Sequence, residues 1–458
     1  MKQLLARFGK TELAAILLVV AAAALLRFPG IAEPRVAIFD EPIYANFAVQ
    51  TLDGVPYFDI HPPFVKMLFA RVIAGETFDT RFITMEPFTP LGDFPYVRVR
   101  TMVALFGIAL VGATYAIARG LGAPKGFAIA SAALVAFDNG LVVYSRAMLP
   151  DTIILTLEFS ALAVGIAAAR SQHAWRAYLL AGTSAILIGL AIASKWTALG
   201  LLGAMGLFYI WKRRFALLAM TLIVVPLVYV GVFLAFFASF PSGGPMQQIL
   251  PHVDAPGVRT IVFPTSLSGA LAILPEFHAG MSAVNADPNF LAHTLEAPGA
   301  ASWPFARNPM IFWKDDPTHA SIVFWGNPYA WIAVFALALA LLLALTARQL
   351  AALGTRAAHE GIDERTKAVL FLIACFVGNY VPFLLINRPM YPYHYLPALV
   401  FLYLLAPFAV TKLREVSERE IGPIFTRRVF LTLLVPISFI FLMLLPQTYG
   451  PMMFSSVL

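Results

Sequence analysis

The sequence contains very little charge and a single cysteine. Asp, Glu, Lys and Arg make up only 12% of its 458 residues, whereas apolar residue types make up 60%. A water-soluble chain of this length carries roughly a quarter charged residues, so this composition excludes a soluble multidomain protein and predicts an integral membrane protein. Because Cys375 has no second cysteine to pair with, no intramolecular disulfide can stabilise any part of the chain.

The sequence also lacks the patterns typical of nucleic-acid, nucleotide and metal binding. The net charge of +7 comes from Lys and Arg scattered in short groups between apolar runs, with no continuous basic face. There is no Gly-rich phosphate loop, and no run of carboxylates, His or Cys has the spacing of metal ligands. We therefore expect no nucleic-acid partner, no cofactor and no divalent metal site.

Long apolar segments predict an all-α polytopic membrane protein. A helix of about 20 apolar residues spans a bilayer, and eleven segments approach that length. The least separated are 177–193 and 196–211, so the span count depends most on this pair. The predicted spans lie at residues 12–28, 97–118, 123–142, 150–169, 177–193, 196–211, 215–240, 323–347, 367–386, 394–411 and 429–446.

The distribution of basic residues predicts the orientation. Nineteen of the 32 Lys and Arg fall in the N-terminal segment and the short connections that share one face, which places the N-terminus in the cytoplasm and the C-terminus outside. The long connections 29–96 and 241–322 then lie outside, with amphipathic helices. We expect residues 1–458 to form a single domain embedded in the cytoplasmic membrane, with its active site on the extracytoplasmic face. Segment 29–96 would carry catalysis, and 241–322 would cover the donor and acceptor sites.

The first long connection contains acids beside helix starts. Asp40 and Glu41 precede an amphipathic helix, and two interpretations stay open. Asp40 is either an N-cap that stabilises this helix or a general base held at the membrane surface. Asp59, His61 and Lys66 follow within 25 residues, around a Pro-Pro helix start. A second acid, an imidazole and a cation this close together favour a functional cluster.

These residues resemble a motif of the protein O-mannosyltransferases, multispanning enzymes that use a lipid-phosphate sugar donor. Asp40-Glu41 followed by Asp59-x-His61-Pro62-Pro63-x-x-Lys66 is similar to the first external loop of that family, and the resemblance extends over residues 39–400. The later similar stretches, in order, are Arg100 with Gly107, Ser145-Arg146 to Asp151, Gly189-Leu190 to Lys195-Trp196, Trp303-Pro304 with Arg307 and Pro309, Gly326-Asn327-Pro328, and His394-Tyr395-Leu396-Pro397-Ala398.

The resemblance implies a function and roles for particular residues. It implies inverting transfer of mannose from a polyprenyl phosphate, which is a substrate and not a cofactor, to Ser or Thr of exported proteins. Asp40 would be the base and Glu41 its supporting acid. The export machinery would be a further partner. Residues expected to bind the donor phosphate or sugar are Arg100, Asp59, His61, Lys66, Arg146, Lys195, Arg388 and His394.

Two departures and two alternatives accompany the resemblance. Asn308 separates Arg307 from Pro309, which are adjacent in the family, and segment 241–322 is too short for the β-trefoil domain of fungal and animal members. One alternative is a related lipid-carrier-dependent transferase, for example one that moves aminoarabinose to lipid A. The other is a transporter, which the absence of an internal repeat and the position of the acids in loops disfavour.

Overall fold

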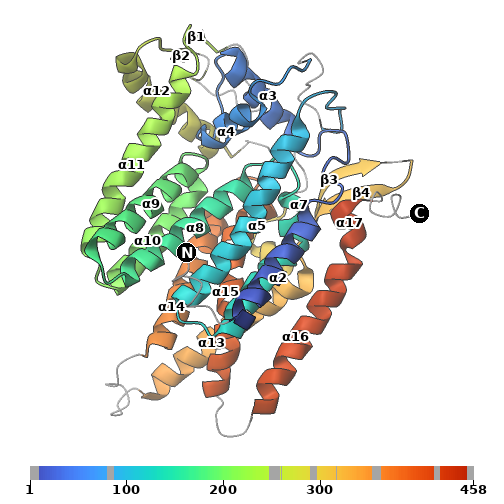
Figure 1. Ribbon diagram of the computed structural model, residues 1–458, viewed down its shortest axis with the longest axis vertical. Coiled ribbons are helices and arrows are strands. Elements are labelled where there is room, and N and C mark those ends of the chain that lie inside the picture. The colour runs from blue at the N-terminus through green and yellow to red at the C-terminus, as the bar shows by residue number, and fades with distance from the viewer. Residues whose placement is uncertain are drawn as a thin grey trace.

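Long apolar helices form the body of the protein (Figure 1). The computed structural model describes residues 10–79, 87–246, 258, 260–288, 297–315, 317–352, 363–416 and 423–450. The bundle contains α2 (Lys10–Arg27), α5 (Tyr96–Gly120), α6 (Lys125–Ala136), α7 (Asn139–Tyr144), α8 (Asp151–Arg170), α9 (Ala174–Ile192), α10 (Leu199–Trp211), α11 (Phe215–Ala238), α13 (Pro328–Ala352), α14 (Glu364–Tyr380), α15 (Leu396–Val416), α16 (Pro423–Met443) and α17 (Leu445–Tyr449).

The helices confirm the predicted all-α polytopic membrane fold. Of the described helices, seven are long and apolar enough to cross a membrane. The other four predicted spans coincide with α6, α10 and α16, whose apolar stretches are shorter, and with α2, which has three charged residues among its 18. The count of eleven spans and the orientation stay predictions.

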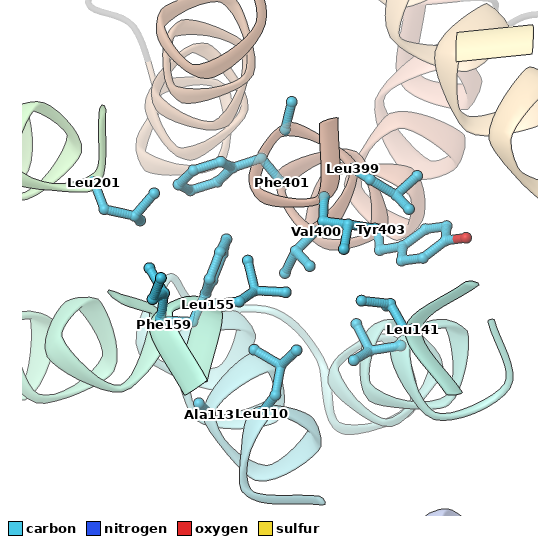
Figure 2. Close-up of a cluster of buried hydrophobic side chains, with 14 of the residues drawn as sticks. Leu110, Ala113, Leu141, Leu155, Phe159, Leu201, Leu399, Val400, Phe401 and Tyr403 are labelled. Atoms are coloured by element: carbon cyan, nitrogen blue, oxygen red, sulfur yellow. The ribbon is translucent and has the colours of Figure 1, made fainter. Parts of the chain in front are cut away.

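Helix α15 forms the centre of the bundle. It is apolar on all sides between Leu396 and Ala409, and nearly all of these side chains are buried, as expected of a helix surrounded by other helices. Figure 2 shows Val400 of α15 on the side of the helix that faces Leu155 of α8, and the Phe401 ring lies 5.0 Å from that of Phe159 of α8. By contrast, α11 and α13 expose leucines such as Leu227 and Leu343, which suits helices that face lipid.

One buried carboxylate links three bundle elements. Asp138 accepts hydrogen bonds from the indole of Trp331 and the hydroxyl of Tyr403, both at 2.8 Å, and caps α7 through the backbone N–H of Leu141. A Cβ on Gly326 would lie 2.0 Å from the Trp331 ring, so only glycine fits there. The Gly326-Asn327-Pro328 stretch therefore has a structural role in this packing.

Shorter elements gather at one end of the bundle (Figure 1). Segment 29–96 contains α3 (Glu41–Asp53) and α4 (Phe64–Ile73), and segment 241–322 contains α12 (Leu267–Ala286). Both long connections are therefore partly helical. Strands were not predicted there, yet segment 241–322 also contributes the pairs β1 (Gly244–Pro245) with β2 (Val262–Phe263) and β3 (Met310–Asp315) with β4 (Ala320–Phe324), both antiparallel.

A second, aromatic core lies apart from the main one. It joins Phe47, Tyr57 and Phe58 of segment 29–96 to side chains of α11 and α12, including Phe233 and Phe277. On the same helix α3, Ala45, Ala48 and Val49 belong to the main core instead. Helix α3 is thus packed between two cores, and its first residue follows directly on Asp40.

Candidate active site

Asp40 lies in the turn that leads into α3. It occupies the N-cap position, but its side chain makes no capping hydrogen bond, so the capping interpretation of this carboxylate is wrong. Within the described parts of the chain, we find no hydrogen bond or ion pair to it. Burial raises the pKa of Asp40 to about 7; Asp151 and Asp59 add to the rise, and Lys195 opposes it. A carboxyl that titrates near neutral pH suits a general base.

Glu41, the next residue, is buried and bound on all sides. Its carboxylate accepts hydrogen bonds from Arg100 through Nη2 at 2.6 Å and Nε at 2.8 Å, in the bidentate geometry typical of this pair. It also accepts the backbone N–H groups of Ile38 at 3.0 Å and Met148 at 2.7 Å. Glu41 therefore joins the start of α3 to α5 and to the stretch 145–151, and it holds the turn in place.

The contacts of Arg100 are those of a structural residue, and they do not favour its predicted role as a phosphate ligand. Its side chain is 1% exposed. Besides Glu41, the guanidinium donates to the carbonyl oxygens of Ile31 at 3.3 Å, Pro34 at 3.0 Å and Val36 at 3.1 Å. These five hydrogen bonds use all five N–H donors of an arginine. The buried Glu41 draws Arg100 inward, so it stabilises the loop before Asp40 and leaves no donor for a phosphate.

Asp59 and Lys66 form another buried pair. The Lys66 ammonium contacts Asp59 Oδ2 and donates to the carbonyl of His61 at 2.6 Å. Burial lowers the pKa of Lys66, against the attraction of Asp59. The two charges neutralise each other. Because Lys66 contacts both Asp59 and the backbone of His61, the pair holds the loop around His61 together. Direct binding of the donor by Asp59 and Lys66 stays a prediction.

His61 is partly exposed beside this pair. Burial holds the pKa of its imidazole well below the usual range, and the positive charges of Lys195 and Lys66 lower it further. A neutral imidazole can donate one hydrogen bond and accept one. His61 is therefore suited to hydroxyl groups of a sugar rather than to supplying positive charge.

The ion pair of Lys195 and Asp151 lies close enough to Asp40 to affect its pKa. Lys195 Nζ is 2.8 Å from Asp151 Oδ1, and Tyr144 donates its hydroxyl to Asp151 Oδ2 at 3.1 Å. Lys195 also lies 4.9 Å from the ring centre of Tyr393. An ammonium has three N–H donors, so a lysine paired through one of them can still bind an anion.

Asp151, Tyr144 and Tyr393 were not among the predicted site residues. Asp151 ends the stretch 145–151 that carries part of the family resemblance, and Tyr144 directly precedes it. The position of Asp151 was therefore a usable signal. Tyr393 precedes His394 in a run of aromatic residues.

His394 lies in an aromatic stack next to Lys195. Its ring is 4.5 Å from that of Tyr393 and nearly parallel to that of Trp303 at 6.3 Å, and its Nδ1 lies 3.0 Å from the carbonyl oxygen of Tyr391. The Trp303-Pro304 and His394 stretches, about 90 residues apart, are thus brought together, as a shared role in one site requires.

A small cavity lies below this stack, lined by His394, Asp151, Thr197 and Glu158 among others. Its volume of about 20 Å³ accommodates roughly one water molecule. Glu158 is 1% exposed, and its Oε1 has no hydrogen-bond partner in the described structure. This acid was not predicted, although a single Glu in an otherwise apolar run was visible in the sequence.

Arg146, another cation predicted to bind the donor, is surrounded by backbone carbonyl groups. Arg146 donates to the carbonyl oxygens of Arg27 at 2.8 Å, Pro29 at 2.7 Å and Gly30 at 3.2 Å, and lies 4.6 Å from the ring of Tyr449. Arg146 thus holds the turn after α2. Binding of the donor by Arg146 stays a prediction.

Arg388 remains a candidate for donor binding. It is partly exposed and donates to Asn285 Oδ1 at 3.2 Å. Its charge also contributes to lowering the pKa of His61, which places it near the same site as Lys195. Binding of the donor phosphate by Arg388 stays a prediction.

The pairing of acids separates Asp40 from its neighbours. In the described structure, Glu41, Asp59 and Asp151 each pair with a cation, and Asp40 does not. Among the same residues there is no cluster of three or more His, Cys, Asp or Glu placed to hold a metal. The site therefore offers Asp40 as an acid that can accept a proton, and Lys195 nearby as a cation that can bind an anion.

Comparison with known protein families shows which family the chain belongs to. The family model described as dolichyl-phosphate-mannose-protein mannosyltransferase matches residues 16–253, and the model of the C-terminal four-TMM region of protein-O-mannosyltransferase matches residues 271–456. The chain belongs to the protein O-mannosyltransferase family. The family resemblance inferred from the motifs is thus confirmed.

Individual members of the protein O-mannosyltransferase family match part of the chain. Dolichyl-phosphate-mannose–protein mannosyltransferase 1 of Saccharomyces cerevisiae is 32% identical over 201 residues, 42% of this chain and 24% of that protein. Protein O-mannosyltransferase 1 of Drosophila melanogaster is 26% identical over 267 residues, 54% of this chain and 29% of that protein. The match thus spans less than a third of the length of either relative.

The structural match extends over nearly the whole chain. The S. cerevisiae protein O-mannosyltransferase Pmt1-Pmt2 complex bound to the sugar donor aligns with a TM-score of 0.78 at 18% identity, covering 96% of this chain and 90% of that one. An oligosaccharyltransferase of Archaeoglobus fulgidus aligns with a TM-score of 0.52 and 13% identity over 96% of this chain and 55% of that one. At these identities the matches establish the shared membrane fold.

Proposed function

We propose that this protein is an inverting glycosyltransferase that moves mannose from a polyprenyl phosphate to Ser or Thr hydroxyls of proteins, with Asp40 as the general base. The observation that carries the proposal is the carboxylate of Asp40, which has no cationic partner in the described structure while the three acids around it do. A base for a hydroxyl has to be ionised yet unoccupied, and Asp40 meets both conditions near pH 7.

The reaction needs one base and one place for negative charge. As the acceptor oxygen bonds to C1 of mannose, its proton passes to the Asp40 carboxylate. The bond between C1 and the phosphate oxygen breaks, and its electron pair stays on the phosphate. This single displacement inverts the configuration at C1 without a covalent intermediate.

Lys195 is the cation best placed for the departing phosphate, since it retains N–H donors beyond its bond to Asp151 and its charge reaches Asp40. Arg388 would add a second positive charge, and the rings of His61 and His394 would contact the sugar. Glu41 would support the base only through the backbone that it holds together with Arg100.

We place the site on the extracytoplasmic face of the cytoplasmic membrane. The asymmetry of Lys and Arg between the two faces supports this orientation. Acceptors would then be exported proteins, and association with the export machinery would bring them to the site unfolded. Segment 241–322 would cover the site, and its contact with the turn before Asp40 supports this role, because Phe312 accepts a hydrogen bond from Phe39 at 2.9 Å.

Membership in the family favours mannose over aminoarabinose as the transferred sugar, and a transferase over a transporter. The test is transfer from radiolabelled polyprenyl-phosphate-mannose to a Ser/Thr peptide by the purified protein in detergent. We expect transfer by the wild type, and a loss of about 10²–10⁴-fold in Asp40→Asn, with binding of polyprenyl phosphate retained.

Asp53→Asn is the matched control, because Asp53 is an exposed acid at the other end of α3. It should retain wild-type activity. Wild-type turnover in Asp40→Asn would refute the base assignment. Absence of transfer by the wild-type protein from this donor, with transfer from another lipid-linked sugar, would refute mannose.

A further inference from the structure

The residue before Asp40 has an unusual backbone conformation. Phe39 has a φ of +47°, in the left-handed region that bulky side chains rarely adopt. Such a conformation persists only where surrounding contacts hold it, and it is common next to reacting groups. Because the Asp40 side chain has no protein partner in the described structure, the backbone of this turn has to determine where its carboxylate lies.

Strand β3 supplies the contacts that hold Phe39. The Phe39 N–H donates to the carbonyl oxygen of Phe312 at 2.9 Å, and the two rings stack at 4.6 Å with planes only 1° apart. Phe312 lies at an irregularity of the β3–β4 hairpin: Ile311 pairs with Val323 and Trp313 with Ile322, so the ladder skips Phe312. A bulge of this kind re-aims a side chain and leaves its carbonyl available to another segment.

The same aromatic group also reaches the ion pair of Lys195. The Phe312 ring stacks on Phe324 of β4 at 5.8 Å, and Tyr144 lies edge-on to both rings at 5.6 Å. Tyr144 donates its hydroxyl to Asp151, the partner of Lys195. The hairpin is therefore in contact with both sides of the site: the turn that carries the base and the residues beside the cation.

We infer that the bulge of the β3–β4 hairpin is a positioning device for the reaction, in which Phe312 fixes the Asp40 carboxylate by holding Phe39. This inference rests on the proposed function of Asp40. Phe312 is a positioning residue, since it acts through Phe39. Misplacement of a reacting group by about 1 Å can cost on the order of 100-fold in rate, so loss of the stack should lower turnover while leaving the donor site intact.

The test compares Phe312→Leu, which keeps an apolar side chain but removes the stack, with Phe312→Tyr, which keeps the ring. Ile311→Ala is the matched control, because Ile311 is the neighbouring residue of β3 and is 56% exposed. We expect kcat of Phe312→Leu to fall at least about tenfold, with an unchanged KM for the lipid donor. Ile311→Ala should retain wild-type kcat, and Phe312→Tyr should retain more of it than Phe312→Leu, because the stacked ring is kept.

The pH profile separates positioning from general destabilisation. A displaced Asp40 carboxyl is better hydrated, so the rising limb of kcat against pH should move to lower pH in Phe312→Leu. The charged groups that surround Asp40, namely Asp59, Asp151 and Lys195, are unchanged in this variant. A mere loss of folded protein would scale the profile without moving it.

A wild-type kcat in Phe312→Leu, or a fall in kcat matched by an equal loss of donor affinity, overturns the positioning role. If Phe312→Leu does not fold, Phe39→Leu makes the same test from the other side of the stack. Loss of transfer in Asp40→Asn with wild-type kcat in Phe312→Leu overturns this inference alone. Wild-type kcat in Asp40→Asn overturns the proposed function and this inference with it.

Discussion

Replacement of Arg100 by alanine should lower the stability of the folded protein without weakening its binding of the lipid donor. The substitution removes five hydrogen bonds and leaves the buried carboxylate of Glu41 without its counter-charge. Breaking a buried pair from one side costs about 3–5 kcal/mol, because the remaining charge stays desolvated. That is a large fraction of the 5–15 kcal/mol that stabilises a typical domain.

The assay has two parts, both on the purified variant in detergent. Thermal unfolding measures its stability, and titration of the folded protein with polyprenyl phosphate measures its affinity for the donor lipid. Arg98→Ala is the matched control, because Arg98 lies two residues away with 57% of its side chain exposed and an ion pair to Glu76. Its loss should cost no more than about 1 kcal/mol. The double variant Glu41→Gln/Arg100→Met should recover part of the stability lost in Arg100→Ala, since no unpaired charge remains.

The refuting result is specific. If Arg100→Ala were as stable as Arg98→Ala and bound polyprenyl phosphate more weakly, Arg100 would be a phosphate ligand after all. Its guanidinium would then leave Glu41 when the donor is bound.

Three further predictions concern the base, the cation and the topology. Turnover should rise with pH and level off above about 7, because Asp40 accepts a proton only when ionised and its pKa is raised to about 7; a rate independent of pH between about 5 and 8 would contradict this. Lys195→Ala should weaken binding of polyprenyl phosphate by about 10–100-fold, as expected for a lost charge-assisted hydrogen bond, and unchanged affinity would exclude Lys195 from the phosphate site. On a Cys375→Ser background, a membrane-impermeant thiol reagent should label Asp53→Cys in intact cells but Gln172→Cys only after permeabilisation, and the reverse pattern would invert the topology.

The helices were predictable because lipid imposes a simple rule on the sequence. A segment that crosses a bilayer has to be apolar over about 20 residues, and this is visible without any knowledge of neighbours. The turn at Asp40 and Glu41 was equally visible as charge next to an apolar run. The β3–β4 hairpin was not, because its strands are short and the bulge at Phe312 interrupts the alternation of buried and exposed residues.

The roles of individual charges were harder to predict, because they depend on partners distant in the sequence. Arg100 was expected to bind the donor phosphate, because it lies at the start of a predicted span beside the first long connection. Its true partner, Glu41, lies 59 positions earlier and is completely buried, and only the fold brings the two together. The same applies to Lys195, whose bond to Asp151 spans 44 positions.

The second, aromatic core has a consequence for the order of events during synthesis. Phe47, Tyr57 and Phe58 are made early, but their partners around Phe277 follow only about 220 residues later. At about 5–20 residues per second, the ribosome needs roughly 10–45 s to produce them. For that interval these aromatic rings lack the part of their packing that α12 supplies. Until α12 is made, the active-site end of a nascent chain therefore keeps aromatic surface uncovered that the folded protein buries.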